Sequence, residues 1–244
     1  MQKLFNLPTL IFIVVLIVAL PFIQRPVVAA EVLTLGIAAV ATNLLLGYTG
    51  MLSFGQALFF GVGAYCAGVL TTKFGLSAFL SIPIAVVFSA VIAWLIGLVC
   101  VRRSGLYFIM ITFAFNQMMF FIAYSWTTVT GGEDGLPGVR RPALIDDQWS
   151  FYIFTVLLFL GSLAIMKLFV NSPTGRILQA IRDNPARAAA TGHDVGRYKL
   201  IAFVMAGMFT GLAGAIFAFV FGIVPIDKID WRFSGDILFM TLLG

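Results

Sequence analysis

The chain has 244 residues, of which 61% are hydrophobic and only 10% are charged, and its formal net charge is +5. A soluble globular domain carries about a quarter charged residues, whereas a bilayer-spanning helix needs roughly 20 mostly apolar residues. Several runs reach that length, so the composition excludes a soluble protein, and the scattering of basic residues between the runs favours membrane topology over a nucleic-acid partner.

The apolar runs predict an all-α fold, a polytopic membrane helix bundle that forms one domain over 1–244. The helices are expected at 7–24, 27–46, 51–71, 78–101, 105–126, 150–170 and 200–222, with an eighth beginning near Asp236. Strands are not expected, because the runs are too long and do not alternate as barrel strands do.

The first apolar run, Leu10 to Leu20 after Lys3, has two interpretations. With Val28–Ala30 behind it, the run has the form of a cleaved signal peptide. An uncleaved first helix is favoured, because the apolar character resumes at Val32 and the run lies far from that cleavage site.

The basic residues predict the orientation of the bundle, because lysine and arginine in short loops are enriched on the cytoplasmic side. One side collects Lys3, Arg102, Arg103, Lys167, Arg176, Arg182, Arg187, Arg197 and Lys199, and the other collects Arg25, Lys73, Arg140, Arg141, Lys228 and Arg232. Of the acidic residues, only Asp183 and Asp194 accompany the first group; Asp236 is placed with the second. We therefore expect the amino terminus and the loop 171–199 in the cytoplasm, and the loop 127–149 outside.

The third segment contains residues that weaken a helix, namely Gly50, Ser53, Gly55 and Gln56. Glycine in a membrane helix serves close packing, or it lets the backbone unwind and offer N–H and C=O groups to a solute. Both interpretations stay open for 50–56. Packing is favoured for the later glycines Gly61, Gly63, Gly68, Gly207, Gly211 and Gly214.

Two amides, Asn116 and Gln117, occupy the middle of the fifth segment. Buried amides usually bond a neighbouring helix, and the alternative is that they line a solute pathway. In the outer loop, the run Gly131–Gly135 is by default a solvated turn.

The loop 171–199 predicts two short helices. The first begins with Ser172 as the capping side chain and Pro173 as the first-turn proline. Asn184 and Pro185 end that helix and start the second in the same way. The second helix, Pro185–Thr191, ends at Gly192. At 1.5 Å per residue the second helix is about 10 Å long, too short to be stable alone in water. It either lies on the bilayer with Arg187 beside lipid phosphates, or docks into a cytoplasmic partner through small alanines and the charges of Arg182 and Arg187.

Four stretches carry a resemblance to a known family: GYTGMLSFGQALFFGVGAY at 47–65, RRSGLYFIMITFAFNQM at 102–118, TGGEDGLPG at 130–138 and SPTGRILQAIRDNPARAAATGHDVGRYKLIAF at 172–203. Together they resemble the LivM-type permeases of branched-chain amino-acid ABC transporters, and they cover much of the chain. The resemblance implies a type II ABC-importer-like permease in the bacterial inner membrane. It also implies a sister permease similar to LivH, two cytoplasmic ATPase subunits and a periplasmic amino-acid-binding protein.

The same resemblance implies roles for particular residues. The coupling helix that meets an ATPase would comprise Arg182, Asn184, Pro185, Arg187, Ala188, Ala189, Ala190 and Gly192. The outer mouth of the periplasmic loop 127–149 would be shaped by Gly132, Glu133, Asp134 and Gly135. The translocation pathway would be lined by Gly50, Ser53, Gly55, Gln56, Asn116 and Gln117.

Two departures from the family accompany these roles. Family members continue with more helix where this chain stops at Gly244, so a truncated product is expected. Arg187 stands where other ABC importers carry the initial Glu of a Glu-Ala-Ala signature.

The sequence lacks the sets of residues that catalysis requires. It contains neither a G-x-x-x-x-G-K-[ST] phosphate loop nor a cluster of metal-ligating residues. His193, its one histidine, is interpreted as a helix-end residue. Cys66 and Cys100 lie in apolar runs and are interpreted as buried hydrophobes, so we expect a non-catalytic subunit without a cofactor.

Three rival functions remain. A secondary transporter or channel usually places charges within its helices, and no predicted helix carries one at its centre. An ABC permease for urea or another small amide is not separated from an amino-acid permease by the sequence. A membrane-embedded enzyme is disfavoured by the missing catalytic set.

Overall fold

The computed structural model describes residues 17, 19–142, 145 and 147–243, and the chain is helical over most of that length. The elements in chain order are α2 (Pro26–Thr49), α3 (Gln56–Thr72), α4 (Ala78–Cys100), α5 (Leu106–Ser125), α6 (Thr127–Thr130), η2 (Gly132–Asp134), β1 (Leu136–Pro137), α7 (Gln148–Asn171), α8 (Pro173–Asp183), α9 (Pro185–Ala190), α10 (Val195–Phe221), β2 (Ile223–Val224), η4 (Ile226–Ile229) and α11 (Trp231–Leu243). The predicted helix 7–24 lies mostly outside the described residues.

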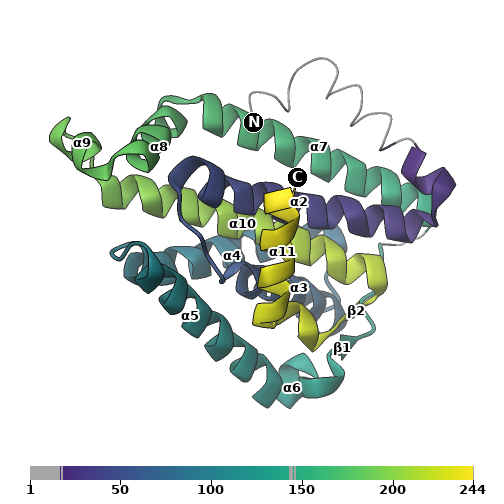
Figure 1. Cartoon of the computed structure of the whole chain (residues 1–244). Helices are drawn as coiled ribbons and strands as arrows, with labels where there is room; N and C mark the ends of the chain where they lie inside the picture. The colour runs from purple at the N-terminus through teal and green to yellow at the C-terminus, as the bar shows by residue number, and fades with distance from the viewer. Residues whose placement is uncertain (1–16, 18, 143–144, 146, 244) are drawn as a thin grey trace.

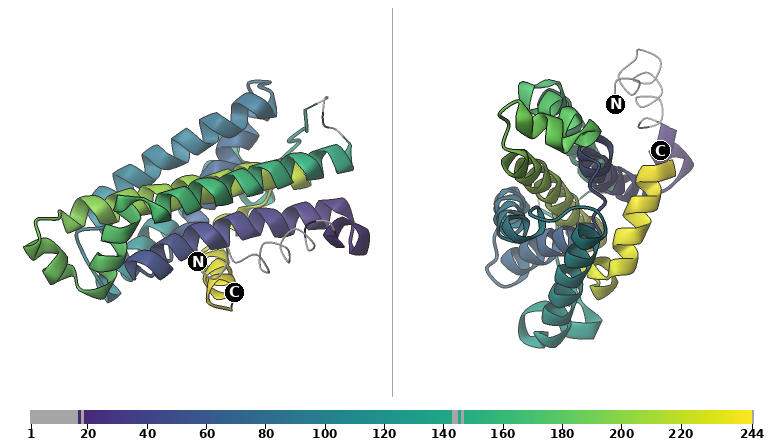
Figure 2. Two further views of the ribbon diagram at one scale, coloured as in Figure 1. Left: turned by 90° about the horizontal axis from the view of Figure 1, so that it is seen from above. Right: turned by 60° about the vertical axis from the view of Figure 1, so that its left-hand side comes forward.

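Five of the described helices, α2, α4, α5, α7 and α10, are long and apolar enough to cross a membrane. Figures 1 and 2 show α8 and α9 together at one end of these helices and the short β1–β2 ladder at the other. We call these ends the α9 end and the β end. The predicted loops 127–149 and 171–199 therefore lie at opposite ends of the bundle, as the sequence indicated.

The centre of the bundle is α10, which packs against α2, α3 and α4. Glycines permit a backbone-to-backbone approach between α3 and α10: a Cβ on Gly63 would lie 2.0 Å from the Gly211 carbonyl oxygen, and one on Gly214 would lie 1.8 Å from that of Phe60. At Gly61, Gly68 and Gly207, side chains of neighbouring elements likewise occupy the space that a Cβ would need. The packing interpretation of these glycines is confirmed.

The third segment is not continuous. The prediction of a helix over 51–71 is wrong for its first five residues, because residues 51–55 are not helical and α3 begins at Gln56. Gly50 ends α2 in the left-handed conformation, with φ at +69°, a geometry that favours glycine. The unwound residues include buried Met51, Ser53 and Gly55, so this irregular backbone lies inside the protein.

The last helix also differs from its prediction. It begins at Trp231, five residues before Asp236, and runs across the long helices in Figure 1. Its Thr241 donates a hydrogen bond to the Ala39 carbonyl in α2 at 3.2 Å, while the Ala57 N–H in α3 donates to Ser234 at 2.8 Å. The helix is oblique because η4 folds back from the β end onto α3 and α5.

Two further predictions need correction. Strands were not expected, yet Leu136 pairs antiparallel with Val224 and Pro137 with Ile223; this short ladder joins distant loops, which hydropathy along the chain does not report. The expectation that no helix carries a charge at its centre is also wrong, since Asp236 is the sixth residue of the thirteen in α11.

Candidate functional site

The loop at the α9 end consists of two capped helices, as the sequence predicted. Ser172 caps α8 by accepting a hydrogen bond from the Gly175 N–H at 3.4 Å. Asn184 caps α9 by accepting one from the Arg187 N–H at 2.9 Å. α9 ends at Ala190, one residue before its predicted end, and Gly192 follows with φ at +87°.

α9 is an exposed projection at the end of the bundle (Figures 1 and 2). Its one buried residue is Ala188, and the other coupling residues are exposed: Arg182, Asn184, Pro185, Arg187, Ala189, Ala190 and Gly192. Within the described chain the Arg187 side chain has no hydrogen-bond or ion-pair partner. The helix therefore presents a small, basic surface to whatever lies beyond this end.

Arg182 differs from Arg187 because its guanidinium is used within the chain. It donates a hydrogen bond from Nη1 to the carbonyl oxygen of Gly47, in the last turn of α2. A Cβ on Gly50 would meet the Arg182 Cγ at 3.4 Å. The loop is thus fixed to the point where α2 ends and the unwound segment begins.

The unwound segment itself is held by polar contacts to α5. The N–H of Phe54 donates to the Thr112 hydroxyl at 3.3 Å, and the N–H of Gly55 donates to the Ser53 hydroxyl at 3.2 Å. Backbone groups buried without water must find such partners. Two N–H groups of the segment are therefore satisfied by side-chain hydroxyls, one from α5 and one from the segment itself, rather than by a helical ladder.

Three amides near this segment are incompletely bonded. Gln56, fully buried, accepts a hydrogen bond from Thr210 of α10 at 2.9 Å, but its Nε2 has no partner among the described residues. Asn116, also fully buried, donates to the Ile229 carbonyl of η4 at 3.0 Å, while its Oδ1, and the Oε1 of half-buried Gln117, have none in the described chain. One buried hydrogen-bond donor and two buried acceptors without partners cost free energy of folding. Unsatisfied buried polar groups of this kind occur at functional sites.

The pathway residues named from the sequence are only partly brought together. Gly55 lies against Thr112 of α5, one helical turn before Asn116, whereas Ser53 bonds Gly55 and Gln56 bonds Thr210 of α10. Gly50 instead lies at the α9 end, against Arg182. Sequence inspection missed Thr112, Thr210 and Ser234, which supply the partners; the spacing of Thr112 and Asn116 by four residues was the available signal.

At the β end, the glycine-rich turn is tightly constrained. A Cβ on Gly135 would lie 2.4 Å from the Val224 carbonyl oxygen, while Glu133 and Asp134 are exposed. Arg141, not singled out from the sequence, donates to the carbonyls of Phe219 and Val220 at 3.0 and 2.7 Å. It therefore caps the carboxyl end of α10 and fastens the outer loop to the bundle.

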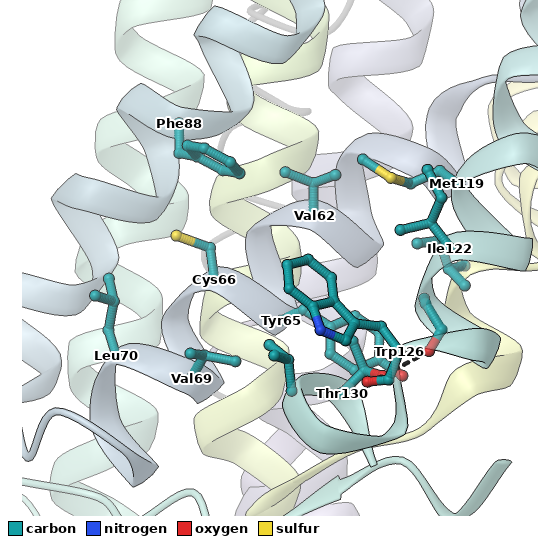
Figure 3. Close-up of a pocket in the computed structure, with 13 residues that line it drawn as sticks. Val62, Tyr65, Cys66, Val69, Leu70, Phe88, Met119, Ile122, Trp126 and Thr130 are labelled. Carbon is teal, nitrogen blue, oxygen red and sulfur yellow. Dashed lines mark hydrogen bonds between the residues drawn. The ribbon is translucent and has the colours of Figure 1, made fainter. Parts of the chain in front are cut away.

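An apolar pocket of about 320 Å³ lies between α3, α4 and α5, nearer the β end. Figure 3 shows Trp126, Cys66 and Phe88 around it. Its lining offers almost no hydrogen-bonding groups, so it does not supply what a zwitterion requires. No group of three His, Cys, Asp or Glu residues in the described chain is arranged to hold a metal ion.

Comparison with known proteins places the chain among transport permeases. The family described as "Branched-chain amino acid transport system / permease component" matches residues 27–244. The chain is 28% identical over 273 aligned residues to the high-affinity branched-chain amino acid transport system permease protein LivM of Escherichia coli K12, covering 100% of this chain and 63% of that protein. It is 27% identical to the LivM of Salmonella typhimurium LT2, with the same coverage.

A more distant relative is the probable branched-chain amino acid transport permease protein LivH of Methanocaldococcus jannaschii, which is 23% identical over 84% of this chain and 67% of its own length. No solved structure matches the chain at a significant level. The chain thus spans 63% of the length of the two LivM relatives.

Proposed function

The chain belongs to the family described as the permease component of branched-chain amino acid transport systems, and we propose that it is the membrane-embedded, non-catalytic permease subunit of an ABC importer. It is a multi-pass membrane protein, with five described helices able to span a bilayer. The proposed cargo is branched-chain amino acids, because the LivM relatives carry that cargo in their names.

The observation that carries this proposal is the geometry of α9. A helix of six residues is unstable alone, yet this one is capped at its start, seated on Ala188 and held out from the bundle by α8. Its exposed alanines allow close approach, and Arg187 is available for a charge-assisted contact. We infer that α9 docks into one of two ATPase subunits.

The charges support an orientation with the α9 end in the cytoplasm. Arg102, Arg103, Arg176, Arg187 and Arg197 gather around that end with few acidic residues, as expected of the cytoplasmic side of a bacterial inner membrane. The β end, with exposed Glu133 and Asp134, would then face a periplasmic binding protein. Gly132 and Gly135 would hold these two carboxylates in place at the outer mouth.

The pathway would run beside the unwound segment, between this chain and a LivH-like sister permease. Broken helices near the membrane interior are where transporters expose backbone groups to solutes. Ser53, Gly55, Gln56, Asn116 and Gln117 would contribute there, and Gly50 would mark the inner limit of the segment.

The test is capture of ATPase subunits through a tag on this chain after co-expression, followed by L-leucine uptake in proteoliposomes with a binding protein. We expect capture by the unchanged chain and by Arg103→Glu, a charge reversal at the same end outside the loop. Arg187→Glu should lose capture or coupled uptake at least tenfold while inserting normally. Equal capture and uptake by Arg187→Glu and Arg103→Glu would refute α9 as the docking helix.

A further inference from the structure

The last helix has two distinct faces. Its inner face, with Phe233, Ser234, Ile237 and Leu238, is buried against the bundle. The opposite side is an exposed stripe that contains Arg232, Asp236, Phe239, Met240, Leu242 and Leu243. Residues four apart on a helix lie on one face, so Arg232 and Asp236 are neighbours in the first half of this stripe.

The stripe lies at intermediate depth in the bundle. Thr241 donates a hydrogen bond to the carbonyl of Ala39. At a rise of 1.5 Å per residue, Ala39 lies about 20 Å from the start of α2 and about 15 Å from its end. At the other end of α11, the Trp231 ring lies 5.8 Å from that of Phe113, about 10 Å along α5 from its first residue. Asp236 is between these two points and therefore far from both ends of the bundle.

Charges at that depth are costly when they face lipid, and they usually face a water-filled cavity or a partner. Among the residues that the structure describes, the Asp236 carboxylate has no hydrogen-bond or ion-pair partner. The Arg232 guanidinium lies 5.9 Å from the centre of the Trp231 ring rather than on Asp236. The charged first half of the stripe is therefore unsuited to hydrocarbon and suited to a polar space.

An aromatic surface adjoins the charged pair. Phe54 of the unwound segment lies 6.5 Å from Phe113, ring centre to ring centre, and Phe113 in turn contacts Trp231. All three side chains are partly exposed. One region thus presents a cation beside an apolar aromatic surface, with an anion one helical turn further along α11.

We propose that this region binds a free zwitterionic α-amino acid with an apolar side chain. Arg232 takes its carboxylate, Asp236 takes its ammonium group, and Phe54, Phe113 and Trp231 pack against its side chain. The assignment rests on the proposed function and adds to it the specificity-determining residues of the pathway.

The test measures water access and occupancy directly, with Gly235→Cys in the full chain carrying Cys66→Ala and Cys100→Ala. Gly235 adjoins Asp236, an added Cβ there meets no atom within 4 Å, and the proposed ligands stay in place. A charged, membrane-impermeant methanethiosulfonate is applied to membranes from both sides. The matched control is Leu157→Cys, an exposed position in the middle of α7 that the proposal leaves in lipid. We expect Gly235→Cys to react at least tenfold faster than Leu157→Cys, and L-leucine, but not leucinol or isovalerate, to slow the reaction.

The outcomes separate this inference from the proposed importer. Equal reactivity at the two positions overturns the aqueous stripe, and a fast reaction that L-leucine does not slow overturns the amino-acid site. In the assembled transporter, Asp236→Asn and Arg232→Gln should each lower L-leucine uptake at least tenfold while ATPase capture is retained. Leucine protection without capture of any ATPase would refute the importer and leave the site standing.

Discussion

The guanidinium of Arg182, in α8, donates a hydrogen bond to the carbonyl oxygen of Gly47, in the last turn of α2. Cationic groups are favourable at a helix carboxyl end, where carbonyl groups lack intrahelical partners. Three residues beyond Gly47 the helix ends and the unwound segment begins. The Arg182 side chain therefore connects the proposed docking loop to the start of the proposed pathway.

Arg182→Gln should impair the transmission of movement from α9 to the unwound segment. We expect L-leucine uptake to fall at least fivefold while ATPase capture and basal hydrolysis stay within twofold, because α9 itself is unchanged. Arg176→Gln removes an equal charge from the exposed side of α8 and should change none of uptake, ATPase capture and basal hydrolysis. Uptake and hydrolysis measured on the same proteoliposomes check this, and parallel loss in both variants would contradict it.

Gly214→Ala should destabilise the bundle, because its Cβ would lie 1.8 Å from the Phe60 carbonyl oxygen and force α3 and α10 apart. Overpacking of this kind costs about 1–3 kcal/mol or more. Gly161→Ala, with no atom within 4 Å of the added Cβ, is the matched control; it should be neutral or slightly stabilising, since alanine favours helix over glycine. Thermal unfolding in detergent distinguishes them, and equal melting temperatures would show that the close approach is not required.

Arg141→Gln should loosen the β end. It removes the hydrogen bonds to the Phe219 and Val220 carbonyls and the contact of the guanidinium with the Phe151 ring at 4.9 Å. Hydrogen bonds to charged groups contribute about 1.5–3 kcal/mol, so we expect a melting temperature lower by several degrees. Arg140→Gln, at the exposed neighbouring residue, should have little effect, and proteolysis of the outer loop offers a second measurement of the same difference.

Much of the architecture was predictable because its causes are local. Long apolar runs identified α2, α4, α5, α7 and α10 within a few residues, with the largest error at the start of α10. The caps at Ser172 and Asn184 located α8 and α9, since a capping side chain acts on an N–H only two or three residues away. Small residues spaced along α10 indicated its close packing.

The remaining features depend on contacts between distant segments. Hydropathy does not distinguish helical from unwound backbone at 51–55; that break is possible because Thr112 and Ser53 satisfy its N–H groups. Nor does it report depth, so Arg232 and Asp236 were placed with the outer loops, whereas η4 turns the chain back and lays α11 across the long helices, away from both ends.

The sequence by itself therefore determined most of the helices, the position of the two polar loops along the chain and the starts of the two short capped helices. Only the tertiary structure decided which polar groups meet in the interior, which arginine is used within the chain and which charges lie far from both ends. The physical reason is range. Helix propensity, capping and hydropathy act over a few residues, whereas burial and hydrogen-bond partners depend on segments as far as 58 to 202 residues apart in the sequence.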